Sequence, residues 1–184
     1  MNNIQKYIAF YEEKVKLALH YANKSKMGMV RSTMKESVEG LLDLIWTTER
    51  GGESKKNDFI KSISPNGYSL QFQVDRHLYD TNGKMVKIGE CKTYLDRDMM
   101  ARASSDFSRI LKGIDIKPTT FIIALEDAVG TAANDYYMDE GNIGKVFYLV
   151  DGKRSPTKPI WRTEFYKPIN ETKLIEFVNF INQK

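Results

Sequence analysis

Two acidic residues and a lysine, Asp75, Glu90 and Lys92, stand on either side of the turn signal Asp80-Thr81-Asn82-Gly83. Glu90 follows Asp75 by 15 residues and Lys92 follows Glu90 by two, so a hairpin that turns at 80–83 would bring them together. Two carboxylates can hold a hard divalent cation, and a lysine can orient a water or stabilise developing negative charge. This spacing therefore predicts a centre for metal-assisted phosphodiester hydrolysis.

The face on which each side chain lies decides whether such a centre can form. Apolar and polar residues alternate from Tyr68 to Leu95, which predicts two strands of a hairpin. Successive strand side chains point to opposite faces, so Asp75 and His77 share one face of the first strand, while Glu90 and Lys92 share one face of the second. The four groups converge if those faces coincide, and a register slip of one residue would separate them.

Helical patterns surround the predicted hairpin. Apolar residues recur at three- and four-residue steps in Ile4–Ala22 and Met34–Thr47, and Ser32-Thr33 offers an N-cap for the second helix. Glu39 lies on that second helix, beside its apolar stripe. A further helix is predicted from about Asp98 to Leu111.

The C-terminal half predicts more strands. Thr119–Leu125 is almost wholly apolar, as expected for a strand buried on both faces of a parallel crossover. Residues 126–144 predict an irregular acidic loop, Lys145–Val150 and Ile160–Tyr166 predict strands, and Asn170 begins a last amphipathic helix. We therefore expect an α/β fold with a mixed central sheet flanked by helices, in a single domain over 1–184, with a core at about 34–126 and C-terminal strands and a helix at 145–184.

Composition limits the partners and the ligands. A net charge of +4 and a pI near 9.0 favour a polyanionic partner. Because the chain has no apolar run of transmembrane length and no secretory signal, we expect a soluble cytoplasmic protein without a membrane partner. One cysteine, Cys91, and two histidines are too few for a Cys/His zinc site, so a metal would bind mainly to oxygen.

The order of these elements resembles the PD-(D/E)xK nuclease superfamily. A helix bearing Glu39 is followed by Val74-Asp75, by Glu90-Cys91-Lys92, and then by a helix and an apolar strand. Asp75 corresponds to the aspartate of the motif, Glu90 to its acidic position and Lys92 to its lysine, whereas Val74 replaces the nominal proline. The resemblance implies a restriction-endonuclease-like core that cleaves DNA.

The same resemblance implies the cofactor and its ligands. The ion would be Mg²⁺, with Mn²⁺ as a substitute, held by Asp75, Glu90 and the backbone carbonyl of Cys91. Glu39 would hold a second ion or a metal-bound water, and His77 would contact a phosphate or a water beside Asp75. Lys92 would orient the attacking water or stabilise developing charge.

Within the superfamily, the chain is similar to the cleavage domain of type IIS restriction endonucleases. Its length and the Glu90-Cys91-Lys92 segment resemble the small catalytic subunit of a heterodimeric type IIS enzyme that cuts one strand. This resemblance implies a prokaryotic cytoplasmic protein, double-stranded DNA as substrate, and a larger recognition subunit or a second nuclease copy as partner.

Other interpretations stay open. The chain could be a repair or junction-processing nuclease with the same core, or a non-catalytic module that binds DNA or protein. At the level of residues, Asp75, Glu90 and Lys92 could form a cross-strand ion pair on a solvated face, and Glu39 could be a helix flank that pairs with a lysine. The Cys91 side chain is expected to point into the core.

Overall fold

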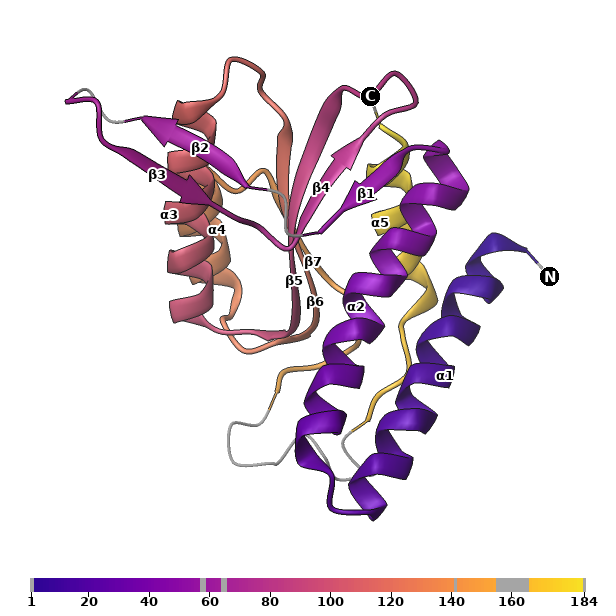
Figure 1. Ribbon diagram of the computed structural model, residues 1–184. Helices are drawn as coiled ribbons and strands as arrows, with labels where there is room; N and C mark the ends of the chain where they lie inside the picture. The colour runs from indigo at the N-terminus through magenta and orange to yellow at the C-terminus, as the bar shows by residue number, and fades with distance from the viewer. Residues whose placement is uncertain (1, 57–58, 64–65, 141, 155–165, 184) are drawn as a thin grey trace.

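A five-stranded mixed sheet forms the centre of the molecule (Figure 1), in a computed structural model that describes all residues except 1, 57–58, 64–65, 141, 155–165 and 184. The strand order is β1-β4-β5-β6-β7. Strands β1, β4 and β5 are antiparallel, whereas β5, β6 and β7 are parallel. These strands are β1 (Glu53–Lys55), β4 (Arg76–Tyr79), β5 (Met85–Leu95), β6 (Thr119–Asp127) and β7 (Lys145–Tyr148).

Helices cover both faces of this sheet and enclose two apolar clusters (Figure 1). One cluster, which includes Trp46 and Phe121, packs beneath α1 (Asn3–Asn23), α2 (Met27–Arg50) and α5 (Glu171–Asn182). The other, which includes Phe107, packs beneath α3 (Arg97–Gly113) and α4 (Thr131–Asp139). The predicted α/β fold with a mixed, helix-flanked sheet is confirmed. None of the described helices combines the length and the apolar character needed to cross a membrane.

The turn between β4 and β5 fixes the register on which the candidate site depends. Asp80 Oδ1 accepts hydrogen bonds from the backbone N–H groups of Asn82 and Lys84, both at 2.9 Å. Gly83 has φ 74°, a conformation that glycine adopts without steric cost. Beyond the turn, Arg76 lies opposite Gly89. The predicted hairpin is therefore confirmed for this part of the chain.

The first strand of that hairpin is shorter than predicted. The alternating stretch before Arg76 belongs to a separate two-stranded sheet, in which β3 (Ser69–Phe72) pairs with β2 (Ile60–Ile63). Leu70 of this strand is 64% exposed. Period-two alternation indicates a strand but does not identify the strand with which it pairs, so one continuous strand was the wrong interpretation.

Other element boundaries also differ from the sequence prediction. Helix α2 begins at Met27, so Ser32-Thr33 lies inside it, and the N-cap residue Lys26 makes no side-chain cap hydrogen bond. The predicted acidic loop contains α4. Asn170 does cap α5, accepting from the Lys173 backbone N–H at 3.1 Å. The strand predicted for 160–166 falls outside the described residues except for Tyr166, which is not in a strand.

Gly89 leaves space that a neighbouring strand uses. A Cβ atom at Gly89 would lie 2.4 Å from the Phe121 ring of the adjacent strand β6. We predict that Gly89→Ala lowers the free energy of unfolding by roughly 1 to 3 kcal/mol, because the buried ring has to shift. Urea unfolding measures the change. Gly28→Ala is the control, since a Cβ there meets nothing within 4 Å, and an equal loss in both variants would contradict this account.

Candidate active site

The hairpin register brings Asp75, Glu90 and Lys92 together. Arg76 lies opposite Gly89 at the end of the β4–β5 pairing, so Asp75, which precedes Arg76, and Glu90, which follows Gly89, come next to this pair. Lys92 Nζ lies 3.1 Å from Asp75 Oδ2 and also donates to Glu90 Oε2. The Cys91 backbone N–H donates to the same Asp75 oxygen at 2.9 Å. The three predicted residues therefore meet at one ammonium group.

Burial separates this cluster from an ordinary surface ion pair. The side chains of Asp75, Glu90 and Lys92 are 18%, 12% and 26% exposed, so the alternative of a solvated face does not describe them. Burial raises the pKa of Glu90 to about 7, since the nearby Asp75 charge adds to the effect of burial and outweighs the attraction of Lys92. Burial acts in the same direction on Asp75, but Lys92 and the Cys91 N–H lower its pKa below the usual range.

Lys92 stays a cation in this setting. Burial by itself would lower its pKa, but the charges of Glu90 and Asp75 raise the pKa above the ordinary lysine value. A protonated lysine donates hydrogen bonds and carries positive charge, and it has no lone pair with which to accept a proton. Its chemistry is therefore charge stabilisation and positioning.

Arg76 of the hairpin forms ion pairs with two carboxylates of α2, the buried Glu39 and the more exposed Asp43. Arg76 binds Asp43 through two nitrogens, Nε to Oδ1 at 2.7 Å and Nη2 to Oδ2 at 3.0 Å, and Nη2 also lies 3.2 Å from Glu39 Oε2. Its third nitrogen, Nη1, donates to the Asp75 backbone carbonyl at 2.7 Å. Arg76 is thus the link between the α2 carboxylates and the backbone that carries Asp75.

Glu39 reaches the edge of the site as a member of this network. Its carboxylate pairs with Arg76 and, at 3.0 Å, with Lys35 Nζ one helical turn earlier. Glu39 also lines a cavity of about 270 Å³ together with Asp75 and Glu90. The structure places it beside the predicted ligands, and its role toward a metal stays a prediction.

The side chains of two other predicted residues are not among those that meet at the Lys92 ammonium. His77 is fully buried in β4 opposite Ile88 and is not among the residues that line the two cavities beside Asp75. The Cys91 side chain is buried in the apolar cluster under α2, as expected, while its backbone N–H serves Asp75. Neither the role of His77 nor that of the Cys91 carbonyl is tested by this arrangement.

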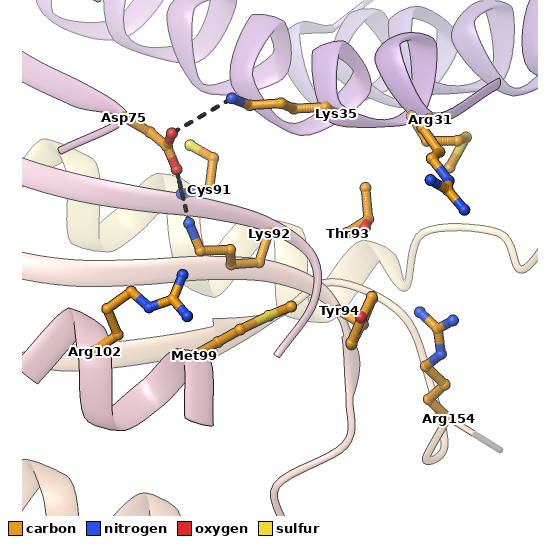
Figure 2. Close-up of a pocket in the computed structure, with 11 residues that line it drawn as sticks. Arg31, Lys35, Asp75, Cys91, Lys92, Thr93, Tyr94, Met99, Arg102 and Arg154 are labelled. Atoms are coloured by element: carbon orange, nitrogen blue, oxygen red, sulfur yellow. Dashed lines mark hydrogen bonds and ion pairs between the residues drawn. The ribbon is translucent and has the colours of Figure 1, made fainter. Parts of the chain in front are cut away.

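Sequence reasoning missed two basic residues beside the site, Lys35 of α2 and Arg76 of β4. Lys35 Nζ lies 3.7 Å from Asp75 Oδ1, and Figure 2 shows Lys35 and Lys92 approaching Asp75 from opposite sides. Arg76 was passed over although it adjoins Asp75 in sequence. The available signal was the four-residue spacing of Lys35, Glu39 and Asp43, which places them on one face of a helix.

The donor set fits a hard divalent cation that keeps part of its water. Among the residues that the structure describes, no group of three or more His, Cys, Asp or Glu is arranged to hold a metal. Asp75 and Glu90 supply two carboxylates with oxygens on one shared ammonium, and Mg²⁺ is typically bound by one or two carboxylates plus substrate phosphate. Burial is the main cause of the raised pKa of Glu90 and the Asp75 charge adds to it, and a bound cation would favour the ionised form of both carboxyl groups.

The Arg76 network gives a stability prediction. Arg76→Ala leaves the buried Glu39 without its guanidinium partner, so we expect the free energy of unfolding to fall by roughly 3 kcal/mol. Arg76→Lys should lower the free energy of unfolding by less, because the positive charge is kept. Some loss should remain, since lysine cannot bind Asp43 through two nitrogens. Urea unfolding measures both.

The matched control is the Lys14–Glu36 pair at 2.9 Å, in which Glu36 is 60% exposed. Glu36→Gln should lower the free energy of unfolding by less than about 1 kcal/mol. A similar small loss for Arg76→Ala would show that the buried network does not hold α2 and the hairpin together.

The raised pKa of Glu90 gives a pH prediction for the metal-free protein. With a pKa of about 7 when folded against 4.5 when unfolded, Glu90 binds a proton in the folded state that the unfolded state has lost. The free energy of unfolding should therefore fall as pH rises between about 5 and 7. Glu90→Gln should flatten this fall, measured by urea unfolding in a chelator, whereas Glu13→Gln on exposed α1 should not. Parallel profiles for the parent and Glu90→Gln would refute the prediction.

Comparison with known proteins identifies the fold. No model of a known family matches the chain, and no curated protein matches its sequence. Two similar solved structures are NucC of P. aeruginosa ATCC27853 and NucC of E. coli MS115-1, both in a cAAA-bound form. The first has a TM-score of 0.52 at 12% identity, covering 98% of this chain and 91% of NucC. The second has a TM-score of 0.53 at 11% identity, covering 98% and 90%.

At these identities the likeness shows the fold and nothing finer. The likeness extends over nearly all of this chain, and its α/β architecture with a mixed five-stranded sheet flanked by helices matches a restriction-endonuclease-like fold. The chain therefore has a restriction-endonuclease-like fold, as the order of its elements predicts.

Proposed function

We propose that the chain is a divalent-metal-dependent endonuclease that hydrolyses DNA phosphodiester bonds, one at each active site. The observation that carries this proposal is the meeting of Asp75, Glu90 and Lys92 at one partly buried ammonium group. Two further facts support it. The fold is restriction-endonuclease-like and similar to that of NucC, and Asp75 and Lys92 line a cavity of about 660 Å³ whose lining has five basic residues and one acidic residue.

Each residue has a role that follows from its charge state. Asp75, with its lowered pKa, stays ionised and supplies a carboxylate for a cation together with Glu90. Lys92 carries a positive charge at the same point, where it stabilises negative charge that develops on a phosphoryl group. A bound Mg²⁺ would polarise a phosphoryl oxygen and lower the pKa of its water.

The finer proposal concerns the assembly. We propose that the chain acts as the small catalytic subunit of a heterodimeric type IIS restriction enzyme in a prokaryotic cytoplasm and cuts one strand of duplex DNA. The resemblance of the sequence around Asp75 and Glu90-Cys91-Lys92 supports this assignment. The partner would be a larger DNA-recognition subunit or a second nuclease copy, since one active site cleaves one strand.

A nicking assay on supercoiled plasmid with Mg²⁺ tests the catalytic proposal. The parent should produce open-circular DNA, and Asp75→Asn, Glu90→Gln and Lys92→Ala should each lower the rate by more than about a hundredfold, because each removes a group that acts on the reacting phosphate. Chelation of the metal should abolish nicking. Glu13→Gln and Lys16→Ala, which change equivalent groups on the exposed surface of α1, should nick at the parental rate.

Other products would redirect or reject the proposal. Retained cutting by the three site variants would exclude this centre. DNA binding without cutting in Mg²⁺ or Mn²⁺ would indicate a non-catalytic module, and a preference for branched DNA would indicate a repair nuclease. Linear plasmid from the chain alone would favour a second copy over a separate large subunit, whereas site-specific cutting only with a candidate large subunit would support the heterodimer.

A further inference from the structure

The cavity of about 660 Å³ beside the active site has more basic residues in its lining than the single carboxylate there, that of Asp75, can neutralise. Five basic residues line it, against the single acidic residue Asp75: Arg31, Lys35, Lys92, Arg102 and Arg154. Lys35 and Lys92 both pair with Asp75. The three arginines are therefore left without a carboxylate in the lining of this cavity.

The three arginines differ in what else they contact. Within the described part of the chain, the side chains of Arg31 and Arg102 make no hydrogen bond or ion pair. The Arg154 guanidinium lies 3.8 Å from the centre of the Tyr94 ring, and its Nη1 is buried without a hydrogen-bond partner. A buried donor without an acceptor costs free energy, and several unpaired cations in one cavity repel one another. An anionic ligand would remove both penalties.

The three arginines are spread along the cavity rather than gathered at one point. Figure 2 shows Arg31, from α2, and Arg154, from the segment after β7, extending from opposite walls at the end of the cavity away from Asp75. Thr93 and Tyr94 lie between that end and the active site, and Arg102, from α3, lies near Lys92. A ligand that satisfies all three arginines must carry negative charges at intervals, as a nucleic acid backbone does.

We propose that Arg31 and Arg154 together bind a backbone phosphate of the substrate strand at a site separate from the reacting phosphate, and that Arg102 binds a phosphate next to the reacting one. This inference rests on the proposed function, because it takes the strand at Asp75 and Lys92 to be DNA. Tyr94 positions Arg154 by stacking against its guanidinium plane, so the cation is oriented before the strand arrives.

Binding without cutting separates this inference from the nuclease proposal. A fluorescein-labelled short DNA duplex is titrated with the protein in a chelator, and the dissociation constant is followed by anisotropy over a range of KCl concentrations. Each phosphate contact that is removed should reduce the slope of log K against log salt by about 0.9 for duplex DNA. We expect that loss for Arg102→Ala and for the Arg31→Ala/Arg154→Ala double variant, whose two arginines share one phosphate, and weaker binding in both.

Two kinds of control exclude general effects. Lys16→Ala removes the same charge from exposed α1, outside the cavity, and should leave the slope at the parental value. The Arg31→Lys/Arg154→Lys variant should keep the slope, because the positive charge remains. If Arg154→Ala fails to fold, Arg154→Gln removes the charge while keeping a stem that packs on Tyr94.

Equal slopes for the parent and the alanine variants, or the same loss in Lys16→Ala, would overturn the inference, as would a parent that does not bind DNA. If the parent and the variants bind DNA with the expected slopes but the parent does not nick plasmid in Mg²⁺, the phosphate-binding sites are supported and the catalytic proposal is rejected.

Discussion

The buried guanidinium of Arg76 is the interaction on which the rest of the site depends. It reaches from β4 to α2, where it pairs with Asp43 and Glu39, and it donates to the backbone carbonyl of Asp75 through its remaining nitrogen. The backbone that carries the Asp75 carboxylate is thereby tied to α2 by the buried Arg76–Glu39 pair and by the more exposed Asp43. Trp46 strengthens the same junction, since its indole N–H donates to the Tyr79 carbonyl at 3.0 Å at the other end of β4.

Sequence reasoning reached the candidate site because local chemistry determines the hairpin. The Asp80 carboxylate and Gly83 specify a tight turn, and a two-residue side-chain period then sets which residues share a face. The apolar run at 119–125 predicted a buried parallel strand for the same kind of reason, and it lies beside β5 as β6. Close to the turn, few residues separate the strand partners, so the sequence pattern was enough to predict which strands pair.

What sequence reasoning missed depends on distant partners. The alternation of Leu70 and Phe72 fits any sheet, and only the three-dimensional structure shows that these residues pair with Ile60–Ile63 rather than with β5. Likewise, α2 extends back to Met27 because Val30 and Met34 pack against the apolar cluster, and no capping side chain announces that start. Arg76 reads as an ordinary surface charge until its carboxylate partners on α2 are known.

Four charged residues that contact or line the candidate site form one stripe along helix α2. Arg31, Lys35, Glu39 and Asp43 follow one another at four-residue steps, so one face of a single helix presents two cations toward the cleft and then two anions toward Arg76. Inserting one residue between Lys35 and Glu39 would rotate the two halves of the stripe by about 100° relative to each other. Length changes in this helix are therefore expected to be far less tolerated during evolution than substitutions on its outer face, and the loop before Met27 is where the chain can vary in length without turning the stripe.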